Sequence, residues 1–173
     1  MASDKAKRWI RIGLLVGAVV AIGAVIAIVV ATRKPPPVKA APIGARLELA
    51  AGQVMVDQGQ GEGRAVSGTA LLADAKVKTA AGARALVRLP DGSSLFLRGS
   101  SAVELGAGKV TLTAGEYWLD APPVEREALV HQAGEVSLTA VDAGLSLQRS
   151  DAGAVVYVAR GMAVLTSPGG RME

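Results

Sequence analysis

The residues of this chain that could do chemistry are concentrated in one stretch, LPDGSSLFLRGSS, from Leu89 to Ser101. A serine nucleophile needs a neighbouring base and a carboxylate that orients the base. The chain has one histidine, His131, and no serine lies in a Gly-x-Ser-x-Gly elbow. We therefore expect no catalytic residue and no small-molecule substrate, and we interpret His131 as a half-exposed strand residue.

Metal and cofactor sites also lack support. The chain has no cysteine, which removes disulfides, thiolate nucleophiles and cysteine-based metal sites. Glu125 and Glu127 lie two positions apart, but a calcium ion takes about six or more oxygen ligands and no Asp-rich loop is present. The sequence predicts no metal and no cofactor, and an exposed loop around the two glutamates.

The polar stretch is better interpreted as a turn between strands. Pro90 suits the second position of a turn, and Asp91 with Gly92 supplies a tight reversal. Ser93 is then a polar group of the turn that can satisfy loop backbone. Leu95 and Leu97 alternate with polar neighbours and are predicted to point inward from the next strand.

The rest of the chain from residue 44 onward consists of short apolar runs of period two, separated by glycines. No helical period is evident there. We predict an all-β domain, either a short-stranded β roll, a solenoid-like fold or a sandwich. The expected strands are 46–49, 53–56, 85–89, 94–98, 102–105, 109–113, 135–139, 145–148, 155–159 and 162–166.

The N-terminal part differs from the domain. The run from Ile12 to Ala31 has no charged or polar side chain. As a helix it would be about 30 Å long, which matches the hydrocarbon core of a bilayer. Signal-peptide cores are shorter, about 7 to 15 residues, so we favour a retained transmembrane helix over a cleaved signal. The predicted organisation is a short basic tail at 1–11, a transmembrane helix at 12–32, a Pro-rich linker at 33–43 and the β domain at 44–173.

Charge is divided between these parts. Residues 1–43 carry seven Lys or Arg and one acid, whereas the remaining 130 residues carry twelve basic and fourteen acidic side chains. A slightly acidic domain with few aromatic residues lacks the surface needed for a phosphate backbone or for stacked bases, so nucleic acid is excluded as a partner. Four basic residues lie on each side of the apolar run, and charge alone does not orient it.

Two features bear on partners. Gly13, Gly17 and Ala21 form a small-xxx-small row in the apolar run, which would allow homo-oligomers through the helix in the lipid bilayer. In GEYWLD, either Tyr117 or Trp118 must face outward if the segment is a strand. We expect Trp118 to be the core residue of the pair.

These segments resemble the FecR-like domain. The run 71–105 matches its pattern through Asp74, Thr79 and the block from Asp91 to Leu97, in which Gly92, Ser93 and Leu95 are part of a "DGS-x-L-x-L" motif. Gly115 and Trp118 resemble the family's "G-x-v-w-f-d", and 155–170 is similar to its closing strands.

The resemblance implies a single-pass protein of the cytoplasmic (inner) membrane with a short cytoplasmic tail and a periplasmic FecR-like domain. Family members of this kind pass a signal to an anti-sigma region. Eleven residues precede the apolar run here, fewer than such a region needs, so we expect no anti-sigma region. The expected role is a non-enzymatic scaffold, signal-sensing or interaction module that binds another envelope protein. A peptidoglycan- or polysaccharide-binding module is the alternative.

Overall fold

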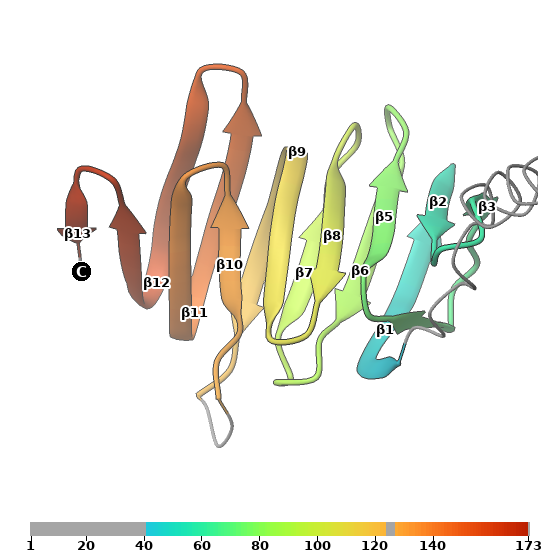
Figure 1. Cartoon of the computed structure of the whole chain (residues 1–173), viewed down its shortest axis with the longest axis horizontal. Coiled ribbons are helices and arrows are strands. Elements are labelled where there is room, and N and C mark those ends of the chain that lie inside the picture. Colours follow the sequence, from blue (N-terminus) through green and yellow to red (C-terminus); the bar gives the residue numbers. More distant parts are fainter. Residues whose placement is uncertain (1–40, 124–126, 173) are drawn as a thin grey trace, which may run out of the picture. The chain divides into compact units, whose positions relative to one another are not determined.

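The computed structural model describes residues 41–123 and 127–172 (Figure 1). These residues form an all-β domain, as the sequence predicted, with thirteen strands where ten were expected. The strands are β1 (Pro42–Ala51), β2 (Val54–Asp57), β3 (Glu62–Arg64), β4 (Thr69–Leu72), β5 (Ala75–Thr79), β6 (Arg84–Arg88), β7 (Ser94–Leu97), β8 (Ala102–Gly106), β9 (Lys109–Ala121), β10 (Val130–Ala133), β11 (Val136–Ser150), β12 (Gly153–Ser167) and β13 (Gly170–Met172).

All thirteen strands belong to one sheet that curls into a half-barrel, so two parts of it face each other. We call the part built on β4, β1, β6 and β7 the back layer, and the part built on β3, β2, β5, β8 and β10 the front layer (Figure 1). Neighbouring strands are antiparallel except β9 and β10, which are parallel. The fold is therefore closer to the predicted roll than to two separate sheets.

Three long strands join the layers. Residues 109–114 of β9 pair with β8 and β10 in the front layer, whereas residues 115–121 pair with β7 and β11 in the back layer. β11 and β12 likewise bend at Asp142 and Gly161, where their pairing is irregular. For β11 and β12 the sequence predicted separate short strands on each side of the bend, and for β9 it predicted a strand at 109–113 alone. These predictions are wrong, because each strand continues through its bend.

Glycines explain why the strands bend instead of ending. Gly115 has φ of 79° and Gly161 has φ of 75°, a region that other residues rarely adopt. A Cβ at Gly115 would lie 2.6 Å from the carbonyl oxygen of Ser100, and one at Gly161 would lie 1.8 Å from that of Asp142. The backbone at both bends is packed so closely that a side chain does not fit.

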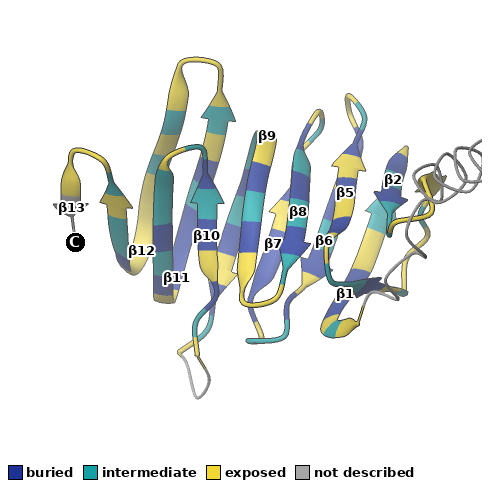
Figure 2. Ribbon diagram, viewed as in Figure 1, coloured by how far each residue is buried: buried dark blue, intermediate teal, exposed yellow. Residues whose placement is uncertain are grey.

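The core lies between the two layers. Along each strand, buried and more exposed residues alternate (Figure 2). The back layer contributes Leu47, Leu95 and Leu119, and the front layer contributes Leu105 and Leu112, all in one apolar cluster. Burying each such leucine stabilises the domain by about 1.5–3 kcal/mol. The core is aliphatic, with Tyr117 as its one buried aromatic residue among those described.

The predicted N-terminal organisation lies largely outside the described residues. This applies to the tail at 1–11, to the transmembrane helix at 12–32 with Gly13, Gly17 and Ala21, and to residues 33–40 of the linker. Within the ranges 41–123 and 127–172, no helix has the length and apolar character needed to cross a bilayer.

Candidate functional site

The outer face of the back layer carries the most distinctive surface of the domain. Cross-strand register aligns one outward residue from each of several strands: Leu49 of β1 is opposite Leu86 of β6, Leu86 opposite Phe96 of β7, and Phe96 opposite Trp118 of β9. Beyond Trp118 come Ser146 of β11 and Tyr157 of β12. We call Leu49, Leu86, Phe96, Trp118 and Tyr157 the outer row.

The outer row is apolar and open to solvent. Phe96 and Tyr157 keep 45% and 65% of their surface exposed, and Leu49 is exposed as well. Three of the four aromatic residues in the described part of the chain belong to this row, although the core beneath it is almost entirely aliphatic. Contiguous exposed apolar surface of this kind often marks an interaction site in soluble domains.

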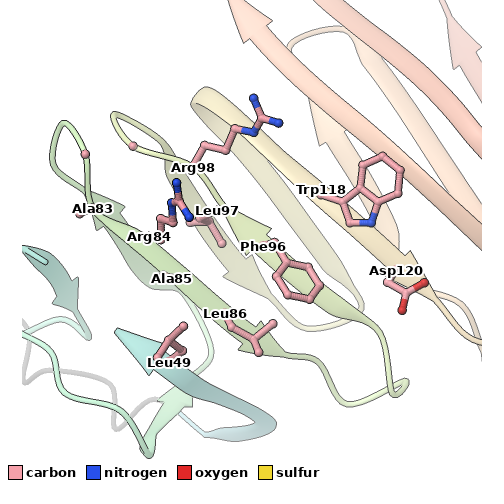
Figure 3. A pocket seen from close by; sticks show the side chains of 12 residues that line it. Leu49, Ala83, Arg84, Ala85, Leu86, Phe96, Leu97, Arg98, Trp118 and Asp120 are labelled. Atoms are coloured by element: carbon pink, nitrogen blue, oxygen red, sulfur yellow. The ribbon is translucent and has the colours of Figure 1, made fainter. Parts of the chain in front are cut away.

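The part of the row from Leu49 to Trp118 lies in a groove of about 1020 Å³ (Figure 3). Phe96 and Trp118 project from neighbouring strands on the same side, and Leu86 and Leu49 continue the apolar surface away from them (Figure 3). Strands in one sheet are about 4.8 Å apart, so these side chains form a continuous strip. The groove can accept an extended apolar segment or a flat ring.

Trp118 is held in place by its neighbours. A Cβ at Gly144 of β11 would lie 3.0 Å from Cζ2 of the indole, so the ring covers the surface that this glycine leaves free. An aromatic side chain over a strand glycine is a known way to stabilise a sheet. Trp118 is therefore half-buried, and its ring has a fixed position at one end of the groove.

Charged residues flank the groove. Arg98 Nη1 lies 3.5 Å from Glu116 Oε2, and Arg160 Nη2 lies 2.8 Å from Asp120 Oδ1. Arg84 also lines the groove, and among the described residues no carboxylate forms an ion pair with it. The end of the groove near Arg84 and Arg98 is therefore cationic, while the carboxylate of Asp120 at the other end is already paired.

On the opposite side of the same strand, Tyr117 points into the core. It is fully buried, and its hydroxyl lies 2.9 Å from Nδ1 of His131 on β10. His131 is only 2% exposed, so its prediction as a half-exposed residue is wrong. Burial lowers the pKa of His131 to about 4, and the carboxylate of Asp91 partly offsets this by favouring the charged ring. Burial also raises the pKa of Tyr117, so both groups are neutral in the core at pH 7.

The expectation that Trp118 would be the core residue of the GEYWLD segment is also wrong. Val110 and Leu112 point inward in the first half of β9, and simple alternation would then put Trp118 inward. A bulge opposite Ala102 and Val103, just before Gly115, adds one residue and reverses the alternation. Tyr117 and Leu119 are buried as a result, and Trp118 reaches the outer row.

The polar stretch that could have been a catalytic loop is a turn between β6 and β7. Gly92 has φ of 90°, and the backbone closes between Leu89 N and Ser93 O at 2.9 Å. Asp91 accepts hydrogen bonds from the backbone N and the hydroxyl of Ser93, both at 2.9 Å, and a longer one of 3.4 Å from Leu129 N. Asp91 therefore stabilises the turn and connects it to the segment before β10.

The remaining family-motif residues are structural. The hydroxyl of buried Thr79 donates to Arg98 O and Ser101 O and accepts from Ser101 N at 3.0 Å, which connects β5 to the loop before β8. Asp74 occupies the β4–β5 turn with φ of 63°, and its N donates to Leu105 O at 2.7 Å. Leu95 and Leu97 are buried in the back layer. In the described ranges, no three His, Asp or Glu side chains are grouped in a way that could hold a metal ion.

Sequence reasoning did not identify the outer row. The alternation in GEYWLD requires one of Tyr117 and Trp118 to face outward, but it does not connect either of them to the other residues of the outer row. The available signal was that Phe96 occupies a position opposite in parity to Leu95 and Leu97 and must therefore face outward. The register that aligns it with Trp118 depends on pairing between β7 and β9, which are separated along the chain by β8.

Comparisons with known proteins agree with this architecture. The family model described as FecR protein matches residues 75–164. Two crystal structures of a candidate anti-sigma factor from Parabacteroides distasonis ATCC 8503, at 2.50 and 1.65 Å resolution, match with a TM-score of 0.50 and with 15% and 16% sequence identity. Each match covers 56% of this chain and 49% of the other, so this chain spans about half the length of the structures it matches. At this identity the likeness concerns the fold alone. No curated protein matches the sequence.

Proposed function

Because this chain belongs to the FecR family, we propose that its β domain is a non-enzymatic interaction module that binds another envelope protein through the outer row. The observation that carries the proposal is the row itself. Four outward apolar residues, from Leu49 to Trp118, line up across neighbouring strands, and Tyr157 continues the line beyond Ser146 of β11. Leu49, Phe96 and Tyr157 are exposed. Aromatic residues in fixed positions on an exposed surface are the usual anchors of protein interfaces.

The distribution of aromatic residues supports binding over stability. Phe96 and Tyr157 remain largely exposed, so they gain little from the fold itself. Burial of apolar surface stabilises the folded state by about 25 cal/mol per Å², and most of the surface of these two rings does not contribute in this way. Their position outside indicates that a partner is expected to cover them.

Charge at the groove favours a particular kind of partner. Arg84 and Arg98 lie at one end, and Arg98 is paired only with Glu116, which is itself partly exposed. A partner segment with apolar side chains and an acidic residue at the arginine end would complement both the strip and its charge. We propose a protein segment of this composition as the ligand.

The proposed setting is the periplasmic side of the inner membrane. In this proposal the helix predicted at 12–32 anchors the chain in the bilayer, and the Pro-rich linker predicted at 33–43 holds the domain away from the lipid surface. A receptor or another envelope protein would then reach the outer row from the periplasm. The shared fold with a candidate anti-sigma factor supports a role connected with signal sensing.

Two contacts support a non-enzymatic role. His131, the one histidine of the chain, is buried and hydrogen-bonded to Tyr117. Ser93 is bonded to Asp91 within a turn instead of to a base. Neither residue is arranged for nucleophilic catalysis, which requires a base in contact with the nucleophile.

Site-specific photo-crosslinking in intact cells tests the proposal. A photoreactive amino acid at position 96, in the groove, should capture a discrete protein, and Trp118→Ala should reduce that product about tenfold, as expected for loss of an aromatic anchor. The matched control places the same group at position 76, which is exposed on the outer face of the front layer. Equal capture at positions 96 and 76, or capture that is insensitive to Trp118→Ala, would contradict the proposal.

The alternative, a glycan-binding module, is favoured by one observation. The exposed rings of Phe96, Trp118 and Tyr157 lie on a single face of the sheet, where they could stack against sugar rings. Cosedimentation of the full chain with purified peptidoglycan separates the two functions. Binding that is lost in Trp118→Ala, together with no protein product at position 96, would support the glycan module instead.

A further inference from the structure

The C-terminal edge of the back layer has an exposed strand. Residues 153–160 of β12 pair with β11 on one side. β13 covers β12 only at residues 165–167, and no other described strand pairs with residues 153–160. The backbone hydrogen-bonding groups on the side of this half of β12 away from β11 therefore face no partner strand among the described residues (Figure 1).

This edge is long and apolar. Val155 is 62% exposed, Tyr157 and Val158 are exposed as well, and no charged residue occurs between Asp151 and Arg160. A long, exposed apolar edge strand is a template for pairing with another chain, and natural domains usually blunt such edges with charge, proline or short length. Residues 153–159 contain no charged residue and no proline, and the one irregularity of this segment is the extra residue Ala159 in its pairing with β11.

The opposite edges of the sheet are protected. β4, at the far edge of the back layer, has only four residues. β3, at the far edge of the front layer, has three residues, Glu62, Gly63 and Arg64, all exposed, and Glu62 forms an ion pair with Lys78. At its N-terminal edges the sheet is therefore protected against pairing with another chain by short strands and by charged residues. The C-terminal edge at residues 153–159 of β12 has neither form of protection.

The inward side of the same strand is incompletely covered. Val156 is opposite Leu147, which is fully buried, yet Val156 itself is only half-buried. Ala154 and Val156 pack against the core cluster without belonging to its buried set. One more strand beside β12 would finish this end of the core (Figure 2).

We propose that the missing strand is β12 of a second copy of this chain, paired antiparallel about a twofold axis at Val156. Two-fold pairing makes every favourable contact twice. In this register Val155 of each copy is opposite Tyr157 of the other, an aromatic and β-branched pair of the kind that stabilises sheets. The Val156 side chains of the two copies meet on the inward side.

Charges fit the same register. Asp151 of one copy comes near Gly161 and Arg160 of the other at both ends of the paired segment, beyond the extra residue Ala159 in the pairing of β12 with β11. Residues between these ends are uncharged, so no like charges oppose each other. Because the edge is complementary to itself in this way, a second copy of the chain fits it. An unrelated strand would need an apolar segment of the same length with charged residues at the same places. The pairing does not depend on what binds the outer row.

Disulfide trapping of the full chain tests the dimer, because the chain has no cysteine of its own. Val156→Cys places one thiol at the proposed axis, where opposite Cα atoms would be about 4.5–5.5 Å apart, within the range of a disulfide. Ala70→Cys on β4 is the matched control, since it is an exposed position on the opposite edge of the same layer. In membranes treated with a mild oxidant, Val156→Cys should give a covalent dimer, and Ala70→Cys should give about tenfold less.

A second variant shows whether a loss of the dimer could come from unfolding instead of from a changed edge. Adding Val155→Lys and Tyr157→Lys to Val156→Cys places charge on the edge and should reduce the dimer about tenfold, while the circular dichroism of the chain keeps its β signal. Mixed Val155→Cys and Tyr157→Cys chains should give a heterodimer. Equal crosslinking at positions 156 and 70, as helix pairing in the membrane alone would produce, overturns the proposal. The absence of dimer both in Val156→Cys and in the mixed Val155→Cys and Tyr157→Cys chains overturns it as well.

Discussion

Tyr117 and Trp118 are neighbours in one strand and have opposite surroundings. Tyr117 lies in the aliphatic core with its hydroxyl bonded to buried His131. Trp118 lies on the outer face, over Gly144 and beside Phe96. The comparison shows that, among the described residues, the ring of Tyr117 lies in the core and the other three aromatic rings lie on the outer face. Changes on the inner face should therefore affect stability, and changes on the outer face should affect binding.

The largest effect is expected where β9 passes from one layer to the other, because this bend decides which ring faces inward. In Gly115→Val, a Cβ would lie 2.5–2.6 Å from Ser100 and Ser101, and φ of 79° is unfavourable for valine. We expect a loss of stability above about 4 kcal/mol, or no folded domain. Urea unfolding followed by circular dichroism measures it. Gly63→Ala is the control, because its Cβ would meet only Val56 O at 4.0 Å; an equal loss there would refute the account of the bend.

The inner and outer rings can be compared directly. Tyr117→Ala removes a fully buried aromatic side chain and should cost about 3–5 kcal/mol. Trp118→Ala removes a half-buried ring on the surface and should cost about 1 kcal/mol or less. Thermal unfolding of the two variants in parallel checks the difference. Similar losses would mean that Trp118 is as important to the fold as Tyr117, and the assignment of the outer row to binding would lose its support.

Acid should weaken the inner face through His131. The pKa of His131 is lowered from 6.5 to about 4 by burial, so the folded state favours the neutral ring. The unfolded chain takes up this proton first, and the corresponding stability is complete above pH 6.5 and is lost as the pH falls toward 4. The loss amounts to roughly 3 kcal/mol.

The measurement is urea unfolding at pH 7, 5 and 4 for the natural chain and for His131→Gln. Glutamine can still accept a hydrogen bond from Tyr117 but does not titrate. The variant should show a smaller loss of stability over this range. Identical pH profiles for the two proteins would show that His131 does not titrate differently in the folded and unfolded states.

The smallest effect is expected from ion pairs of the outer face. Arg160→Gln removes contacts to Asp120 at 2.8 Å and Asp142 at 3.3 Å, but all three side chains are well exposed. Exposed pairs of this kind contribute about 0–1 kcal/mol. A thermal melt should therefore barely change. A clear loss would show that the bends of β11 and β12 depend on this arginine, and the outer face would then have a stabilising role.

Much of the domain could be predicted from its sequence. Period-two alternation and the regular spacing of glycines identified an all-β fold, because each strand must present apolar residues to one side. The DGS block and the neighbouring segments identified the FecR family. The prediction of ten short strands was less accurate, since a glycine with positive φ can bend a strand without ending it, as at Gly115 and Gly161.

The candidate site could not be predicted in the same way. Alternation counted from Val110 and Leu112 puts Trp118 inward, and one added residue at a bulge reverses the result. His131 was predicted to be half-exposed because it follows Leu129 and Val130 at what the sequence indicates is the start of a strand. Its burial follows from being covered on the inside of the half-barrel by Tyr117, fourteen residues earlier.

The sequence by itself determined the class of fold, the family and the absence of cysteine chemistry, because these depend on composition and on local pattern. Only the tertiary structure decided which of two adjacent rings lies in the core, which five side chains share the outer row, and which edge remains open at β12. Those properties depend on strand register and on bends in β9, β11 and β12. Register is set by contacts between strands far apart in the chain, and a shift of one residue exchanges the two faces of a strand.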